Sequence, residues 1–206
     1  MPCYHIPAYP AVSAIDWQTV PAAPIAHFLW EKNGFCPVTF AQLAWTEDAL
    51  HARLWSHEQQ PLSTHTAHQS AVCEDSCLEF FVNFLPLETS DFFNFEVNPN
   101  GAMLAAFGPP RYDRAPLPLE TWAAQMDIRP QVIPGVGWGV EYRIPWALVR
   151  SIQPGFTPEK GRMILGNFYK CGDKTPLPHY GAWNPVETKA PDFHRPEFFA
   201  TMMLEG

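Results

Sequence analysis

Two stretches with alternating side chains constrain the fold more than any other part of this 206-residue sequence. Within residues 77–84, one side of the alternation is apolar, with Leu, Phe and Val, and the other side consists of Cys77, Glu79, Phe81 and Asn83. Within residues 92–98 the alternation returns, and its mostly polar side consists of Phe92, Asn94, Glu96 and Asn98. A period of two is typical of a β-strand with two different faces. We therefore predict a hairpin of two strands joined by residues 85–91.

The predicted hairpin gathers carboxylates and amides on one surface when the apolar sides of its strands face the same way. Carboxylates accept hydrogen bonds, and amides both donate and accept them, so such a row can bind several hydroxyl groups at once. The candidate ligand-binding residues on this surface are Glu79, Asn94, Glu96 and Asn98.

The rest of the chain favours many short strands separated by irregular loops. Strands are predicted over residues 38–45, 50–55, 138–144, 163–171 and 198–204, and from a mixed pattern over 121–132. Residues 107–119 hold four prolines and are predicted to be a loop. Residues 146–151 follow Pro145, which suits a helix N-terminus, and are predicted to form one or two helical turns.

These elements, with 23 prolines and 14% aromatic residues, predict an all-β protein. A two-layer antiparallel β-sandwich is the natural way to bury both apolar sheet faces, with long Pro-rich loops and at most short helical turns. We expect residues 1–206 to form a single domain, because the length requires no more than one.

The charge of the chain excludes several kinds of partner. The formal net charge is −8, and the 13 Lys and Arg residues form no basic run, so we expect neither nucleic-acid nor membrane binding. Five cysteines do not suggest a disulfide scaffold. The first residues lack a signal-peptide pattern, so we expect a cytoplasmic protein, or an extracellular one if a signal segment has been removed. The sequence does not determine the oligomeric state.

The order of short segments along the chain resembles the family 9 carbohydrate-binding modules, which occur beside xylanases and belong to the DOMON-like, jelly-roll-like β-sandwiches. The segments that carry this resemblance are Asp16-Trp17, residues 43–50, 74–81 and 93–98, Glu141-Tyr142-Arg143-Ile144-Pro145-Trp146, Gly166-Asn167-Phe168, Trp183 and residues 193–198. The resemblance implies non-catalytic binding of a sugar or oligosaccharide end, in carbohydrate catabolism.

The resemblance also implies roles for particular residues. Glu79 matches the glutamate and Asn94 the amide that take the hydroxyls of a terminal sugar unit. Where the family has two sandwiching tryptophans, this chain has Cys73 and Phe193. The expected stacking platform is therefore Tyr180, Trp183 or Phe193, and the predicted ligand set includes Trp183 and Phe193. Since no acidic run typical of a calcium site is present, we expect no cofactor.

Two alternatives remain open from the residues alone. Glu79 and Glu96 could act as a glycosidase pair, because glycoside hydrolysis uses two carboxyl groups about 5 to 10 Å apart. His65, His68, Cys73 and Cys77 could together hold a metal ion, since zinc binds imidazole and thiolate ligands. We favour a binding protein over an enzyme, and we expect no metal ion.

Overall fold

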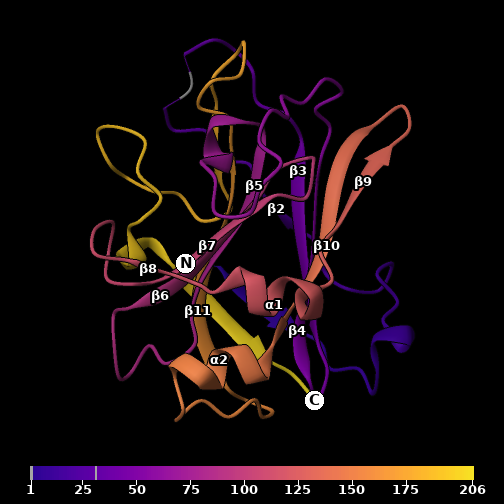
Figure 1. The fold of residues 1–206 in the computed structure, drawn as a ribbon, viewed down its shortest axis with the longest axis vertical. Coiled ribbons are helices and arrows are strands. Elements are labelled where there is room, and N and C mark those ends of the chain that lie inside the picture. Colours follow the sequence, from indigo (N-terminus) through magenta and orange to yellow (C-terminus); the bar gives the residue numbers. More distant parts are fainter. Residues whose placement is uncertain (1, 31) are drawn as a thin grey trace.

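The framework consists of two β-sheets that face each other, in a computed structural model that describes residues 2–30 and 32–206 (Figure 1). The larger sheet has the order β1-β13-β11-β5-β6-β7-β8, and β12 also pairs with β11. Its strands are β1 (Cys3–Ile6), β5 (Cys77–Asn83), β6 (Phe92–Val97), β7 (Met103–Gly108), β8 (Ala115–Pro116), β11 (Met163–Cys171), β12 (Tyr180–Ala182) and β13 (Ala200–Leu204).

The second sheet has the order β2-β3-β4-β10-β9. Its strands are β2 (Ala23–Pro24), β3 (Thr39–Trp45), β4 (Ala49–Ser56), β9 (Arg129–Ile133) and β10 (Gly137–Pro145). The helices are α1 (Leu119–Met126) and α2 (Trp146–Ile152), with 3-10 turns at Val12–Ala14, Val72–Glu74 and Pro196–Phe198. No helix within the described ranges has the length and apolar character needed to cross a membrane.

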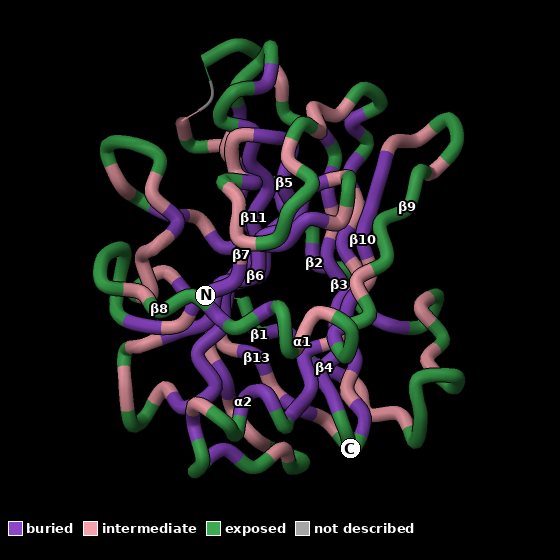
Figure 2. Tube along the Cα trace, in the orientation of Figure 1, coloured by how far each residue is buried: buried purple, intermediate pink, exposed green. Residues whose placement is uncertain are grey.

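The alternation in β5 and β6 gives the larger sheet two different buried faces. Phe80 and Phe95 are directly opposite each other on these strands and belong to the core between the two sheets. Phe81 and Phe92 point to the other face and pack in a second apolar cluster beneath the loops. Figure 2 shows the central strands as buried and the outer loops as exposed. The polar residues of β5 and β6 therefore lie on a face that loops cover.

The all-β sandwich prediction is confirmed, and the structure corrects three details. The pairing is mostly antiparallel, but β1 runs parallel to β13 at the edge of the larger sheet. Residues 121–132 were predicted as strand, whereas α1 occupies Leu119–Met126, because Leu119 and Met126 bury one face of a helix there. The chain leaves α1 at Asp127, whose left-handed backbone (φ 49°) ends the helix. Residues 107–119 are not all loop, because β7 extends to Gly108 and β8 pairs with it.

Candidate functional site

A pocket of about 400 Å³ opens on the loop-covered face of the larger sheet. Its floor comes from β5, β6 and β11 and consists of Glu79, Phe81, Glu96 and Cys171. Its walls come from Cys73, Asp173 and Tyr180 and from residues 111–112 and 191–194. Segments that are far apart in the sequence thus meet around the polar residues of the hairpin.

Two carboxyl groups face each other on the pocket floor. The register of β5 and β6 places Glu79 directly opposite Glu96, and their exposed fractions are only 2% and 5%. Burial, together with the charge of Glu96, raises the pKa of Glu79 well above its ordinary value. Burial also raises the pKa of Glu96, to about 7. Burial therefore favours the protonated form of Glu79, which can donate a hydrogen bond as well as accept one.

Asn94 orients Glu96 and does not line the pocket. Its Nδ2 donates to Oε1 of Glu96 at 2.9 Å, and its Oδ1 accepts hydrogen bonds from Arg114 Nε at 3.1 Å and Nη2 at 2.7 Å. Arg114 also lies over the ring of Phe92 at 4.0 Å and donates to the carbonyl oxygens of Gly108 and Pro109. Asn94, which was predicted as a ligand residue, thus belongs to a hydrogen-bond network that links the Pro-rich loop (residues 107–119) to β6.

Asn98 is fully buried outside the pocket, which corrects its predicted ligand role. Its Nδ2 donates to the carbonyl oxygen of His65 and to Oδ2 of Asp75, both at 2.8 Å. Its Oδ1 accepts hydrogen bonds from the backbone amides of Asn100 and Ala102. The side chain is therefore used to hold the turn after β6.

The two predicted aromatic residues lie on opposite sides of the larger sheet. Trp183 is buried in the core between the sheets, against Tyr4 and Phe168, so it cannot stack on a ligand in the pocket. Phe193 does line the pocket, but one ring face is covered by Tyr169, whose ring lies parallel at 4.1 Å. Only the part of the Phe193 ring that Tyr169 leaves uncovered can therefore contact a ligand.

Tyr112 and Tyr180 provide the more accessible aromatic surface. Tyr112 is 72% exposed and lines the pocket from the Pro-rich loop. Tyr180 lines the pocket from β12, and its hydroxyl group hydrogen-bonds the carboxyl group of Asp173. Both rings can cover the apolar C–H face of a ring-shaped ligand.

An ion pair links two loops at the rim of the pocket. Nη1 of Arg111 lies 2.9 Å from Oδ1 of Asp192, which joins the Pro-rich loop to the segment that carries Phe193 and His194. Burial lowers the pKa of His194 to about 4, so its imidazole is neutral near pH 7. Its Nδ1 is buried and has no hydrogen-bond partner within the described part of the chain. The ion pair therefore holds the segment that places the neutral ring of His194 at the pocket.

The alternative metal set of His65, His68, Cys73 and Cys77 does not come together in the described part of the chain, and both histidines have other partners. Nδ1 of His68 accepts a hydrogen bond from the backbone amide of Met103 at 3.1 Å. Nε2 of His65 lies 3.4 Å from Oε2 of Glu74. Across residues 2–30 and 32–206, the cluster with metal-ligating atoms close together is Cys77, Glu79 and Cys171.

Several pocket residues were missed from the sequence. Arg111, Tyr112, Asp173, Asp192 and His194 all come from irregular segments. No periodic pattern marks such residues, because loops have no regular side-chain alternation. The sequence signal at these positions is the concentration of Pro and aromatic residues within 107–119 and 172–196. Such a composition indicates ordered loops, but it does not show in which direction their side chains point.

Comparison with known proteins places this arrangement in a family. The family model described as carbohydrate-binding family 9 matches residues 10–204, which is nearly the whole chain. The chain belongs to carbohydrate-binding family 9. Family 9 comprises non-catalytic carbohydrate-binding modules, so the glycosidase alternative for Glu79 and Glu96 is set aside. A search among curated proteins gives no match.

Solved structures share the fold of this family 9 chain. A candidate carbohydrate-binding protein from Bacteroides uniformis has a TM-score of 0.84 at 24% identity, with 98% of this chain and 99% of that one covered. A family 9 module from Caldicellulosiruptor kristjanssonii in complex with glucose has a TM-score of 0.70 at 15% identity, with 100% and 96% covered. Its complex with cellotriose has a TM-score of 0.69 at 15% identity, with 100% and 94% covered. At these identities the likeness concerns the fold.

Proposed function

We propose that the pocket above β5 and β6 binds the terminal unit of a neutral sugar or oligosaccharide, without catalysis, in the context of carbohydrate catabolism. The observation that carries this proposal is the buried pair Glu79 and Glu96 on the floor of a pocket with aromatic walls. Its volume of about 400 Å³ lies within the range of about 300 to 1,000 Å³ usual for small-molecule sites. An enclosed floor with loop walls suits the end of a chain better than its middle.

The carboxyl pair provides complementary hydrogen bonds for adjacent hydroxyls. In its protonated form, which burial favours, Glu79 donates to a hydroxyl oxygen, whereas Glu96 is held by Asn94 and accepts a hydroxyl proton. Desolvated polar groups of this kind discriminate strongly, because a ligand that lacks the matching hydroxyl leaves them unpaired.

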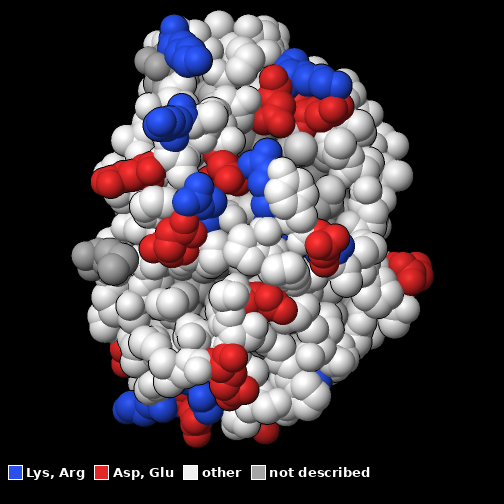
Figure 3. Space-filling view, turned by 90° about the vertical axis from the view of Figure 1, so that its left-hand side faces the viewer, with Lys and Arg blue, Asp and Glu red and all other residues white. Residues whose placement is uncertain are grey.

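The charges around the pocket favour a neutral ligand. Four carboxyl residues line it, namely Glu79, Glu96, Asp173 and Asp192, whereas the basic residue in the lining, Arg111, is already paired with Asp192. A sugar acid would therefore place a carboxylate beside acidic groups without a matching cation. Figure 3 shows acidic and basic side chains interspersed over one face of the molecule, with no large patch of one sign.

Isothermal titration calorimetry with glucose, cellobiose, cellotriose, xylobiose and glucuronate tests the proposal. We expect binding of at least one neutral sugar and none of glucuronate. Glu79→Leu, which keeps the volume but removes both oxygens, should weaken binding at least tenfold, whereas Glu79→Gln should retain most of it. Glu47→Leu, at an exposed position, is the matched control. The absence of heat for every sugar at millimolar concentrations would refute the proposed function.

A further inference from the structure

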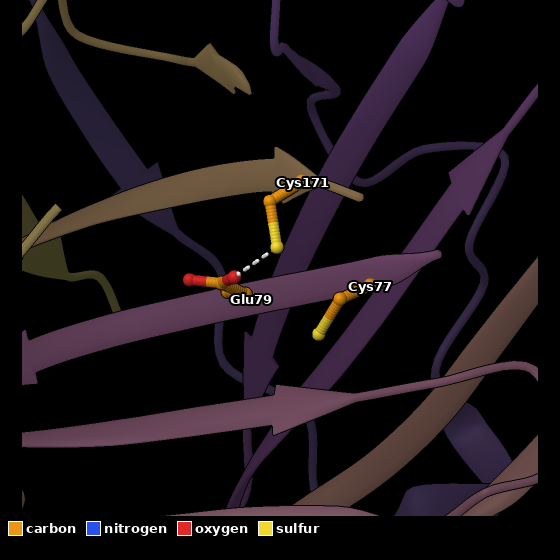
Figure 4. Close-up of side chains that lie close together, drawn as sticks. All are labelled: Cys77, Glu79 and Cys171. Carbon is orange, nitrogen blue, oxygen red and sulfur yellow. Dashed lines mark hydrogen bonds between the residues drawn. The ribbon is translucent and has the colours of Figure 1, made fainter. Parts of the chain in front are cut away.

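Three ionisable ligand groups meet where β5 pairs with β11, and two of them, Glu79 and Cys171, line the pocket. Cys77 on β5 lies directly opposite Cys171 on β11, and Glu79 follows Cys77 by two residues on the same face of β5. Their two sulfur atoms and one carboxylate oxygen all lie within 4.8 Å of one another. Figure 4 shows one Glu79 oxygen directed at the sulfur of Cys171 and the other turned away from both thiols, with Cys77 beside them on β5. From this geometry we propose that Cys77, Cys171 and Glu79 bind a thiophilic divalent cation such as Zn²⁺.

The contacts within the cluster are those of groups that hold protons in place of a cation. Sγ of Cys171 donates to Oε1 of Glu79 at 2.8 Å. A hydrogen bond with Cys77 and burial raise the pKa of the Cys171 thiol, and burial raises that of Cys77 to about 12. A bound cation replaces these protons, because thiols and carboxylates ligate metal ions in their deprotonated forms.

The basic side chains nearest the cluster are already engaged elsewhere. Nζ of Lys170 lies 3.0 Å from Glu58 Oε2, and it also contacts His179 Nε2 at 2.7 Å. Arg114 is held by Asn94 and by backbone carbonyls. Lys170 and Arg114 are therefore committed to other partners, and a divalent cation can balance the negative charge that the three groups carry once they lose their protons.

The donor atoms select the kind of metal ion. Two sulfurs and one oxygen suit Zn²⁺ and Co²⁺, whereas Ca²⁺ and Mg²⁺ require oxygen ligands. The pocket provides a path for the ion, because Glu79 and Cys171 form part of its floor. Cys73 lines the same pocket, and its carbonyl oxygen lies 3.7 Å from Sγ of Cys171.

Titration of the reduced, metal-free protein with CoCl₂ tests this proposal, because Co²⁺ bound to thiolates gives near-ultraviolet charge-transfer absorption. We expect saturation at one ion per chain, displacement by ZnCl₂, and release of about two to three protons per ion, measured by calorimetry in buffers of different ionisation enthalpy. Cys171→Ser should abolish the absorption band, and Glu79→Gln should weaken Co²⁺ binding at least tenfold.

Cys3→Ser is the matched control, because Cys3 is an exposed thiol on β1. It should leave the titration unchanged. Thermal unfolding of each variant shows whether it is folded, and Glu79→Gln keeps the test valid if Cys171→Ser does not fold. No band in the wild-type protein, or a band that survives both pocket substitutions, would overturn the proposal. Sugar binding is measured separately and is expected to survive Glu79→Gln, so the two proposals can fail independently.

Discussion

The carboxyl pair on the pocket floor should make the stability of the protein depend on pH through Glu96. In the unfolded chain this carboxyl group has its ordinary pKa of 4.5, whereas burial raises its pKa in the folded protein to about 7. Between these pH values the folded state keeps a proton that the unfolded chain has released. The free energy of unfolding therefore falls as the pH rises from about 4.5 through about 7, and this loss is complete above that range.

The size of this effect follows from the difference between the two pKa values. At about 1.36 kcal/mol for each pH unit, the difference of about 2.5 units corresponds to a loss on the order of 3 kcal/mol. Glu96→Gln removes the ionisation while keeping the oxygen that accepts the Asn94 hydrogen bond. The variant should match the wild type near pH 4.5 and exceed its unfolding free energy by up to about 3 kcal/mol at pH 8.

Urea denaturation at several pH values between 4.5 and 8 measures this difference. Glu47→Gln removes an exposed carboxyl group and should follow the wild-type pH dependence, so it serves as the control. If Glu96→Gln lost stability with pH as steeply as the wild type, the reasoning that Glu96 holds its proton in the folded protein would be refuted.

Three further substitutions test other parts of the structure by urea denaturation. Arg114→Ala should destabilise the protein by about 2 to 4 kcal/mol, because it removes charged hydrogen bonds to Asn94 and to the Pro-rich loop; an effect below about 1 kcal/mol would contradict that role. Lys170→Met should cost about 3 to 5 kcal/mol, because it leaves Glu58 buried without its cation, and adding Glu58→Gln should recover part of the loss. Trp183→Ala should destabilise the protein by about 3 to 5 kcal/mol, because core packing is lost, but it should leave the sugar affinity of the folded protein within twofold. A much larger loss of affinity would show that Trp183 contributes to sugar binding.

The strands next to the pocket could be predicted because their alternation is local. The pattern in residues 77–84 and 92–98 predicts β5 and β6 and places Glu79 and Glu96 on the same face. The pattern does not show that Cys171 lies opposite Cys77, because that contact depends on the pairing of β5 with β11, whose strands are far apart in the sequence. The chemistry of the pocket floor therefore becomes visible only when the sheet order is known.

The incorrect assignments have local physical causes. Asn98 follows the polar alternation of β6, yet the turn after that strand uses its amide to satisfy buried backbone groups. Trp183 lies in an irregular segment with no periodicity, so the sequence could not show that its side chain enters the core. Residues 119–126 form a helix although their apolar pattern is mixed, because Leu119 and Met126 are buried on a common helical face.

The central claim is that the pocket above Glu79 and Glu96 holds a sugar end, and a crystal structure with the tightest-binding neutral sugar tests it most directly. We predict the terminal ring between Tyr112 and Tyr180, with hydroxyl oxygens within hydrogen-bond distance of both carboxyl groups. Electron density for the sugar on another part of the surface, with this pocket empty, would contradict the account.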